Sequence, residues 1–391
     1  LADLFSAPRS QLRYSSDTVL GRAYVALRPL PAVDVVTDAY PGQPCALLLD
    51  DGGELCAAIG RALRDHGWSV HRLLLPGVPD ERGDGRPLDN WSDGALRDSI
   101  AGLVGAVARV DLCVLPMSRS SVGSGDEAVT RLTHALLFAK RVRPALLEAA
   151  RAGRRAAFVT VTRLDGALGY SGSGGEPVAA LAGGLAGLVK SFALESPPVF
   201  CRALDLAPGL SDKAIGDALL EEIADVATDV LEVGRGEGHR RTPVLSHAPH
   251  RLLPAAPGTA SGLTEDDLLL VTGGASGITA WCLEALAPEH RCGYVLLGRR
   301  SEADEEIRPA LEALRSRGVR VAYVSADVRD AAAVRAALEP HAQHVTGVIH
   351  AAGVLGDRPL PEMTSESAGP VITTKLSGLR NVLDALAPGR L

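Results

Sequence analysis

Long apolar runs and clusters of basic residues are both missing from this sequence of 391 residues. No run of 18 or more apolar residues is free of charge, and the longest candidate, residues 177–194, contains Lys190. A membrane-spanning helix needs about 20 predominantly apolar residues, so we expect no membrane span. The formal net charge is −7 and only four of the 40 basic residues are lysines. No basic run stands out, which argues against a nucleic-acid partner.

Paired cysteines and clustered metal ligands are also lacking. The six cysteines show no CxxC spacing, and several fall in apolar strand or helix patterns. We therefore expect buried free thiols in a reducing cytoplasm. His247 and His250 could form a metal pair, but they fall in a Pro-rich stretch without further ligands, so we expect no metal site. With 46% hydrophobic residues, a chain of this length can bury two substantial cores.

A glycine turn between a strand and a helix is the strongest motif present. The apolar run 268–271 predicts a buried strand, the pattern over 278–286 predicts a helix, and 294–297 predicts a second strand. Together they form a βαβ unit. The helix N-terminus offers unpaired N–H groups and a positive dipole end to a pyrophosphate. The residues expected to bind it are Thr272, Gly273, Gly274, Ser276, Gly277 and Ile278.

The second strand of this unit ends in Arg299 and Arg300. An acid at this position would hold a free ribose 2′-hydroxyl, whereas arginine suits a 2′-phosphate. We therefore expect NADPH rather than NADH. The alternative is a surface turn followed by two solvated arginines, and the flanking strand and helix argue against it.

Two more motifs follow the next two expected strands: Ala326-Asp327-Val328 and His350-Ala351-Ala352-Gly353-Val354. With residues 272–278 they resemble the short-chain dehydrogenase/reductase family, and more closely the ketoreductase domains of type I polyketide synthases. Thr279 departs from the family pattern, in which a glycine is common at that place. The stretch 277–280 is nearer the ketoreductases of polyunsaturated fatty acid and enediyne-type synthases. The resemblance spans roughly residues 40–391 and is specific in the last third of the chain.

The resemblance implies further cofactor contacts. Asp327 and Val328 would lie near the adenine, and the backbone at Ala351, Ala352 and Gly353 would pass close to the ribose. Asp327 could also, or instead, be a helix N-cap.

The resemblance also implies a catalytic and a stereocontrolling residue. Lys375 falls in an expected helix over 364–386, where these ketoreductases place their catalytic lysine. Its charge can orient the ribose and lower the pKa of a tyrosine. Asp357 resembles the mark of B-type ketoreductases, which fix one hand of the alcohol product. The alternatives are a solvated lysine and an exposed loop acid.

Residues 41–75 repeat the plan of the βαβ unit. Strands are expected at 45–49 and 70–75, with a turn at 50–53 and a helix at 55–63. In the aligned copies Asp51 replaces Thr272 and Cys56 replaces Gly277. Two acids at a phosphate turn would repel the ligand, so this copy should keep the fold without binding a dinucleotide.

The rest of the first half alternates strands and helices and resembles the structural subdomain of these ketoreductases. Glu221 and Asp225, four residues apart in a helix expected over 210–227, predict a solvated acidic face. Tyr170 and Lys190 lie twenty residues apart, whereas a reductase pair lies four apart on one helix. We interpret both as structural, and the loop 170–175 as a surface loop.

The predicted fold class is α/β, with two Rossmann-like lobes that have parallel sheets. The expected parts are a linker (1–40, with a possible strand near 24–27), a structural lobe (41–245), a second linker (246–266) and an NADPH-binding lobe (267–391). The second lobe is expected to be incomplete, because the family's serine and tyrosine follow the lysine and no tyrosine occurs after Lys375.

The resemblance implies reduction of a β-ketoacyl thioester on an acyl carrier protein, within a synthase that supplies the other domains. We expect this chain to be a fragment with little or no turnover of its own. The alternative is a non-catalytic scaffold or cofactor-binding module of a synthase. An independent epimerase-like member of the superfamily is disfavoured by the degenerate first copy.

Overall fold

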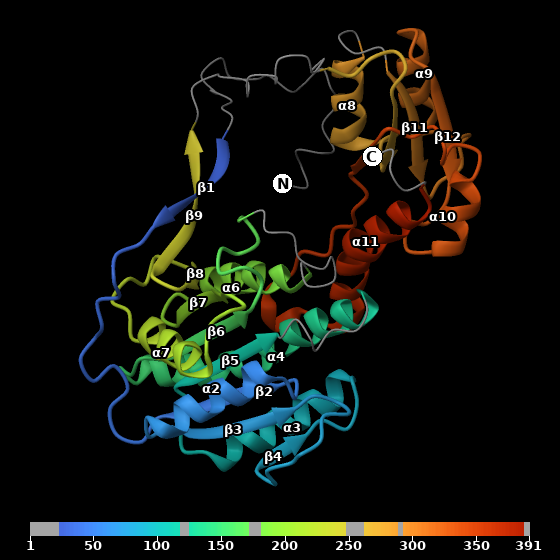
Figure 1. The fold of residues 1–391 in the computed structure, drawn as a ribbon. Coiled ribbons are helices and arrows are strands. Elements are labelled where there is room, and N and C mark those ends of the chain that lie inside the picture. The colour runs from blue at the N-terminus through green and yellow to red at the C-terminus, as the bar shows by residue number, and fades with distance from the viewer. Residues whose placement is uncertain (1–22, 118–124, 172–180, 248–261, 288–291, 387–391) are drawn as a thin grey trace. The chain divides into compact units, whose positions relative to one another are not determined.

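The computed structural model describes residues 23–117, 125–171, 181–247, 262–287 and 292–386. These residues divide into two compact units, which Figure 1 colours by position along the chain. The first unit comprises Val25–Ser246 with Gly356–Gly369. The second comprises the described parts of Leu1–Tyr24, His247–Leu355 and Pro370–Leu391. The segment Gly356–Gly369 thus belongs with the first unit, although the sequence boundaries group it with the second half of the chain.

The first unit is built on one nine-stranded sheet with the order β1-β9-β8-β7-β6-β5-β2-β3-β4. Its strands are β1 (Ala23–Pro29), β2 (Cys45–Asp50), β3 (Ser69–Leu74), β4 (Gly85–Pro87), β5 (Leu112–Met117), β6 (Ala157–Thr162), β7 (Phe200–Leu206), β8 (Glu232–Gly236) and β9 (His239–His247). Strands β2 to β8 pair in parallel, whereas β8 and β9 are antiparallel. The two-residue connection Glu237-Gly238, with Gly238 at φ +69°, makes this hairpin. The sheet is therefore mixed, where a parallel one was predicted.

Helices cover both faces of this sheet because strand residues alternate in direction. The helices are α2 (Glu54–Asp65), α3 (Asp93–Ala106), α4 (Gly125–Arg151), α6 (Gly184–Glu195) and α7 (Asp212–Ile223). Helices α2 and α7 share a core with Val159 of β6. The next residue back, Phe158, stacks on Phe192 of α6 with ring centroids 4.2 Å apart, so α6 lies on the opposite face.

The second unit contains a four-stranded parallel sheet with the order β12-β11-β10-β13. Its strands are β10 (Leu268–Thr272), β11 (Gly293–Gly298), β12 (Val321–Ser325) and β13 (Gly347–His350). Leu269 and Val271 pack in one core with α8 (Gly277–Leu286) and α9 (Arg308–Ser316). Leu270 packs on the other face with α10 (Ala331–Leu338) and α11 (Ser365–Asp384). This unit is doubly wound, as the sequence predicts.

Most predicted elements lie where the sequence places them. The βαβ unit β10-α8-β11 and its earlier copy β2-α2-β3 both form with parallel strands, and β1 joins the first sheet. Strands β4 and β8 and helix α3 were not predicted. Strand β4 has three residues, and β8 contains two glycines, so neither has a clear apolar pattern. None of the described helices combines the length and apolarity that crossing a bilayer requires.

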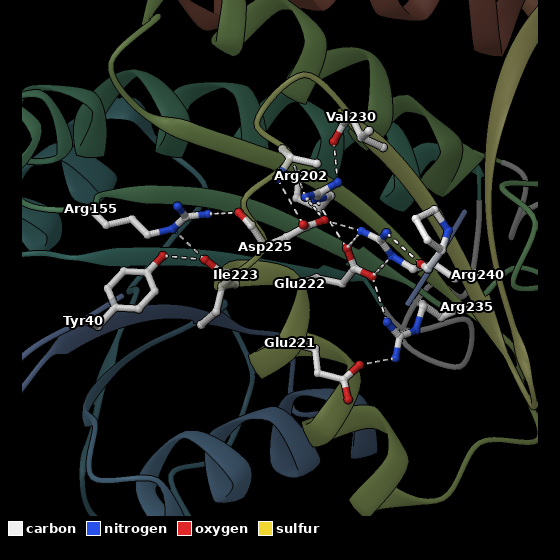
Figure 2. Close-up of polar contacts among 12 residues, drawn as sticks. Tyr40, Arg155, Arg202, Glu221, Glu222, Ile223, Asp225, Val230, Arg235 and Arg240 are labelled. Atoms are coloured by element: carbon white, nitrogen blue, oxygen red, sulfur yellow. Dashed lines mark hydrogen bonds and ion pairs between the residues drawn. The ribbon is translucent and has the colours of Figure 1, made fainter. Parts of the chain in front are cut away.

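The prediction of a solvated acidic face on α7 is wrong. Helix α7 ends at Ile223, so the four-residue spacing of Glu221 and Asp225 does not place them on one helix face. Asp225 is only 2% exposed, and its neighbour Glu222 is fully buried. Figure 2 shows that these acids point into a group of arginines from β7, β8 and β9.

This buried charge cluster ties α7 to the β8–β9 hairpin. Arg240 donates to both oxygens of Glu222 at 2.7 and 2.9 Å, and Arg202 donates to Asp225 at 3.0 Å (Figure 2). Arg202 has no exposed surface, and burial lowers the pKa of its guanidinium while Glu222 and Asp225 oppose that shift. Because the charges balance inside the protein, removing one leaves its partners buried and unpaired.

We therefore predict that Glu222→Gln lowers the free energy of unfolding by about 3–5 kcal/mol, the range for breaking a buried ion pair. The measurement is urea unfolding of the first unit, followed by circular dichroism. Glu221→Gln is the matched control, because the half-exposed Glu221 pairs with Arg235 and such pairs contribute about 0–1 kcal/mol. Equal losses of unfolding free energy in the two variants would show that the buried ion pairs contribute no more than the half-exposed pair.

Candidate functional site

A pocket of about 300 Å³ lies at the carboxyl ends of the strands in the second unit. The strand order reverses there, because β11 and β12 lie to one side of β10 and β13 lies to the other. Doubly wound sheets bind ligands at such a switch point. Nine of the predicted cofactor residues line the pocket: Gly273, Ser276, Arg299, Arg300, Asp327, Val328, Ala351, Ala352 and Gly353.

The glycine turn brings two backbone segments together. Gly273 has φ +67°, and a Cβ on it would lie 3.1 Å from Cα of Ala352. A side chain would thus be strained and crowded at this position. Ser276 precedes α8 but makes no side-chain cap, so it leaves the N–H groups of the first turn to other partners.

The other predicted residues of the turn do not line the pocket. Gly274 packs inward, where a Cβ would lie 2.9 Å from Cγ1 of Val271. Gly277, at φ +60°, opens α8 in free space, and the side chain of Ile278 is 54% exposed.

Thr272 is fully buried behind the pocket and holds the loop opposite. Its Oγ1 accepts the N–H of Ala352 at 3.0 Å and lies 3.0 Å from Nδ1 of His350. Nε2 of His350 lies 3.1 Å from the carbonyl of Thr374 on α11. The carbonyl can only accept, so Nε2 carries the proton and Nδ1 accepts from the threonine hydroxyl. Thr272 and His350 therefore join β10, β13 and α11.

The chemistry around His350 favours its neutral form. Burial lowers the pKa of His350, and the charge of Lys375 lowers it further, against the hydrogen bond to Thr374. The neutral tautomer keeps the three-part connection intact at neutral pH. The sequence motif includes His350 but does not indicate this structural role.

The backbone of the two arginines is fixed from β12. The hydroxyl of Tyr323 donates to the carbonyl of Arg300 at 2.9 Å, and that of Ser325 to Arg299 at 3.2 Å. The guanidinium of Arg300 is paired with Glu306 and Asp304, and the bond to Glu306 raises its pKa. Arg299 makes no ion pair within 4 Å to any described residue. Tyr323 and Ser325 were not singled out from the sequence.

Asp327 lines the pocket and pairs with Arg329 at 2.7 Å, which lowers the pKa of its carboxyl. It does not cap α10. The N-cap is Asp330, which accepts from the N–H groups of Ala332 and Ala333 at 3.0 Å each. The N-cap interpretation of Asp327 is therefore wrong.

Lys375 is exposed on α11, and its ammonium lies beside the pocket. A Cβ on Gly353 would lie 3.3 Å from both Cε and Nζ of Lys375. Farther along α11, Nδ2 of the buried Asn381 donates to the carbonyl of Val328 at 2.9 Å. Asn381 was missed, and its place beside Val382 on the apolar face of the helix was the available signal. Asp357, by contrast, is exposed in the first-unit segment and does not line this pocket.

The earlier copy of the turn is closed by its own carboxylates. Oδ1 of Asp50 accepts the N–H of Gly52 at 2.8 Å, and Oδ1 of Asp51 accepts that of Gly53 at 3.0 Å. Arg72 pairs with Asp50 at 2.7 Å. Ligand atoms of Asp50, Asp51 and Cys56 lie within 4.8 Å of one another. Burial raises the pKa of the Cys56 thiol, which donates to Asp51 at 3.0 Å. The acids thus occupy the N–H groups that a phosphate would need.

Tyr170 and Lys190 line a common cavity of about 340 Å³ in the first unit, although they lie far apart in sequence. Nζ of Lys190 is 3.2 Å from both carboxylate oxygens of Glu232. The lysine charge is therefore shared with an acid, whereas Lys375 makes no ion pair with any residue that the structure describes.

Comparison with known proteins agrees with this geometry. Residues 268–391 match the family model of the KR domain. The chain is 28% identical over 319 residues to a polyunsaturated fatty acid synthase of Thraustochytrium sp., covering 66% of this chain and 11% of that protein. It is 31% identical over 342 residues to the erythronolide synthase EryA3 of Saccharopolyspora erythraea, covering 81% and 10%. The chain thus spans about a tenth of these relatives.

Solved structures share the fold over nearly the whole chain. An A1-type ketoreductase has a TM-score of 0.68 at 22% identity, covering 93% of this chain and 71% of that one. The first ketoreductase of the tylosin synthase has a TM-score of 0.66 at 20% identity, covering 94% and 70%. The chain therefore shares the fold of polyketide-synthase ketoreductases, and its residues 268–391 match the KR domain family.

Proposed function

We propose that this chain provides the NADPH site of a synthase ketoreductase. The reaction is reduction of a β-ketoacyl thioester on an acyl carrier protein to a 3-hydroxyacyl thioester. One observation carries the proposal: a single pocket is lined by the glycine turn, both arginines and the loop beside Lys375. NADPH, when bound, supplies the hydride.

The residues present suit that cofactor. The start of α8, which has no side-chain cap, offers its backbone N–H groups to the pyrophosphate. Arg299 has no acid paired to it among the described residues, so its guanidinium can hold the 2′-phosphate. The guanidinium of Arg300 is already ion-paired with Glu306 and Asp304, so Arg300 contributes less to binding of the 2′-phosphate. Lys375, next to Gly353, would orient the ribose.

The reduction also needs a proton donor for the ketone oxygen. Tyr323 is the tyrosine in the pocket lining, and its hydroxyl already donates to Arg300, while burial raises its pKa. Tyr323 is therefore a positioning group and a poor acid. We propose that the donor is the family's tyrosine, in the parent polypeptide beyond Lys375, and that this chain alone turns over little or no substrate. Asp357 is proposed to set the hand of the alcohol.

The alternative is a cofactor-binding module without catalysis. The test is fluorescence titration with NADPH, and a reduction assay, on this chain and on one extended along the parent reading frame. Binding by both with reduction only by the longer chain supports the ketoreductase. Binding without reduction by the longer chain supports the non-catalytic module. If neither binds NADPH, the assignment of the pocket is wrong.

We predict that Arg299→Ala weakens NADPH binding by about ten-fold and leaves NADH binding unchanged. The reason is loss of a charge-assisted bond to the 2′-phosphate, which contributes about 1.5–3 kcal/mol. Titration of both cofactors measures the effect. Arg335→Ala is the control, because Arg335 is exposed on α10 and does not line the pocket. An equal loss of affinity for NADH would contradict the proposal that Arg299 binds the 2′-phosphate.

Lys375→Met is predicted to weaken binding of NADPH and NADH alike by about ten-fold, because the ribose hydroxyls are common to both. Lys213→Met is the matched control, since Lys213 is exposed on α7 and pairs only with Asp217 in the first unit. Titration with NADPH and NADH measures the effect. Unchanged affinity of Lys375→Met for both cofactors would contradict a role of Lys375 in cofactor binding.

A further inference from the structure

The chain between Gly353 and Lys375 takes a detour through the first unit. It leaves the second unit after Leu355 and re-enters it at Pro370. On the way it forms a short 3-10 helix (Leu360–Glu362), and Leu360 is buried, with only 4% of its surface exposed. A surface loop between β13 and α11 would not need such burial.

Two side chains of the first unit hold this segment by its backbone. Oε2 of Glu195, at the end of α6, accepts the N–H of Leu360 at 2.8 Å. Nζ of Lys140, on α4, donates to the carbonyl of Met363. Both are charge-assisted bonds to main-chain groups, and both side chains are half-buried, which strengthens them relative to bonds at an open surface.

Helix α4 supports both anchors. Lys140 and Arg143 lie three residues apart and therefore face the same way. Arg143 donates to the carbonyl of Glu195 at 2.7 Å and to Oγ of Ser196 at 2.8 Å. The end of α6 is thus fixed from α4, and Glu195 with it.

The anchored segment runs directly into α11. Thr364, next to Met363, exchanges hydrogen bonds with Ser367: each backbone N–H donates to the other residue's hydroxyl, at 3.0 and 3.2 Å. This capping exchange starts the helix that carries Lys375. Pro370 inside α11 has no N–H for the carbonyl four residues earlier, which weakens the link between the first turn and the rest of the helix. External anchors therefore matter more at this helix start.

We propose that Glu195 and Lys140 are positioning residues, which hold the segment 356–369 and thereby place Gly353 and Lys375. The anchoring does not depend on the proposed function. Its consequence at the cofactor pocket does rest on the proposed NADPH site.

The test uses the full chain and amide hydrogen exchange, read by mass spectrometry on peptides covering 356–364. Glu195→Ala and Lys140→Met should each speed exchange there by about ten-fold, the loss expected for one charge-assisted hydrogen bond. Glu195→Gln keeps an oxygen that accepts the Leu360 N–H but loses the charge, so its exchange should be clearly slower than that of Glu195→Ala. The exchange rate in β7 should stay the same in every variant. This control distinguishes local loss of anchoring from unfolding of the whole unit.

Matched controls are Glu148→Ala, an exposed acid on α4, and Lys190→Met, whose ion pair lies outside the segment. Both should exchange like the unchanged protein. If Glu195→Ala and Lys140→Met leave exchange of 356–364 unaltered, the anchoring is refuted. The same holds if Glu195→Gln behaves like Glu195→Ala.

NADPH titration tests the consequence. Glu195→Ala and Lys140→Met should raise the Kd by about five-fold or more, within the usual range of coupling between sites, and Glu195→Gln should not. Faster exchange with unchanged NADPH affinity would overturn the positioning role. If the unchanged protein itself binds no NADPH while the exchange differences appear, the proposed function fails and the anchoring is supported.

Discussion

The contact on which the second unit depends is the close approach of two backbones, at Gly273 and Ala352. It needs glycine at position 273, after β10, because a side chain there would crowd Ala352. It also needs a hydrogen bond that holds the backbone of Ala352, after β13. Thr272 supplies that bond, and His350 extends it to α11. The pocket, the arginine pair and the loop beside Lys375 all lie near this contact at the carboxyl ends of the parallel strands β10 and β13.

The two halves of the chain use one plan with opposite chemistry at the turn. In the second unit Gly273 and Ser276 of the turn line a pocket, and the start of α8 has no side-chain cap. In the first unit Asp50 and Asp51 accept the N–H groups of the turn internally, and Arg72 balances the charge. A fixed carboxylate there does locally what a bound phosphate would do. The first unit thus keeps the fold and has its own buried charges.

The packing of the first unit supports the proposed anchors at Glu195 and Lys140. The charge cluster of Glu222, Asp225 and the arginines ties α7 to the sheet, and Arg143 ties α6 to α4. A segment held by such a body has few alternative positions. The anchored segment would then restrict Gly353 and Lys375, which flank it along the chain.

The sequence by itself determined the α/β class, the duplication, the glycine turn with its arginines, and the order of the elements around them. These are local signals: apolar runs, glycines at a strand end, and helical spacing. It also indicated half of the residues that line the pocket, because the carboxyl ends of neighbouring parallel strands meet at one edge.

Only the tertiary structure decided which polar groups face each other. Asp225 looks like a surface acid by spacing, yet α7 stops before it and two arginines from distant strands surround it. Nothing in the sequence indicated that Thr272 accepts the N–H of Ala352 and so holds the loop after β13. The roles of Tyr323, Asn381, Glu195 and Lys140 also depend on partners far away in sequence. Burial and pairing of polar groups are properties of the packed chain, and no local pattern encodes them.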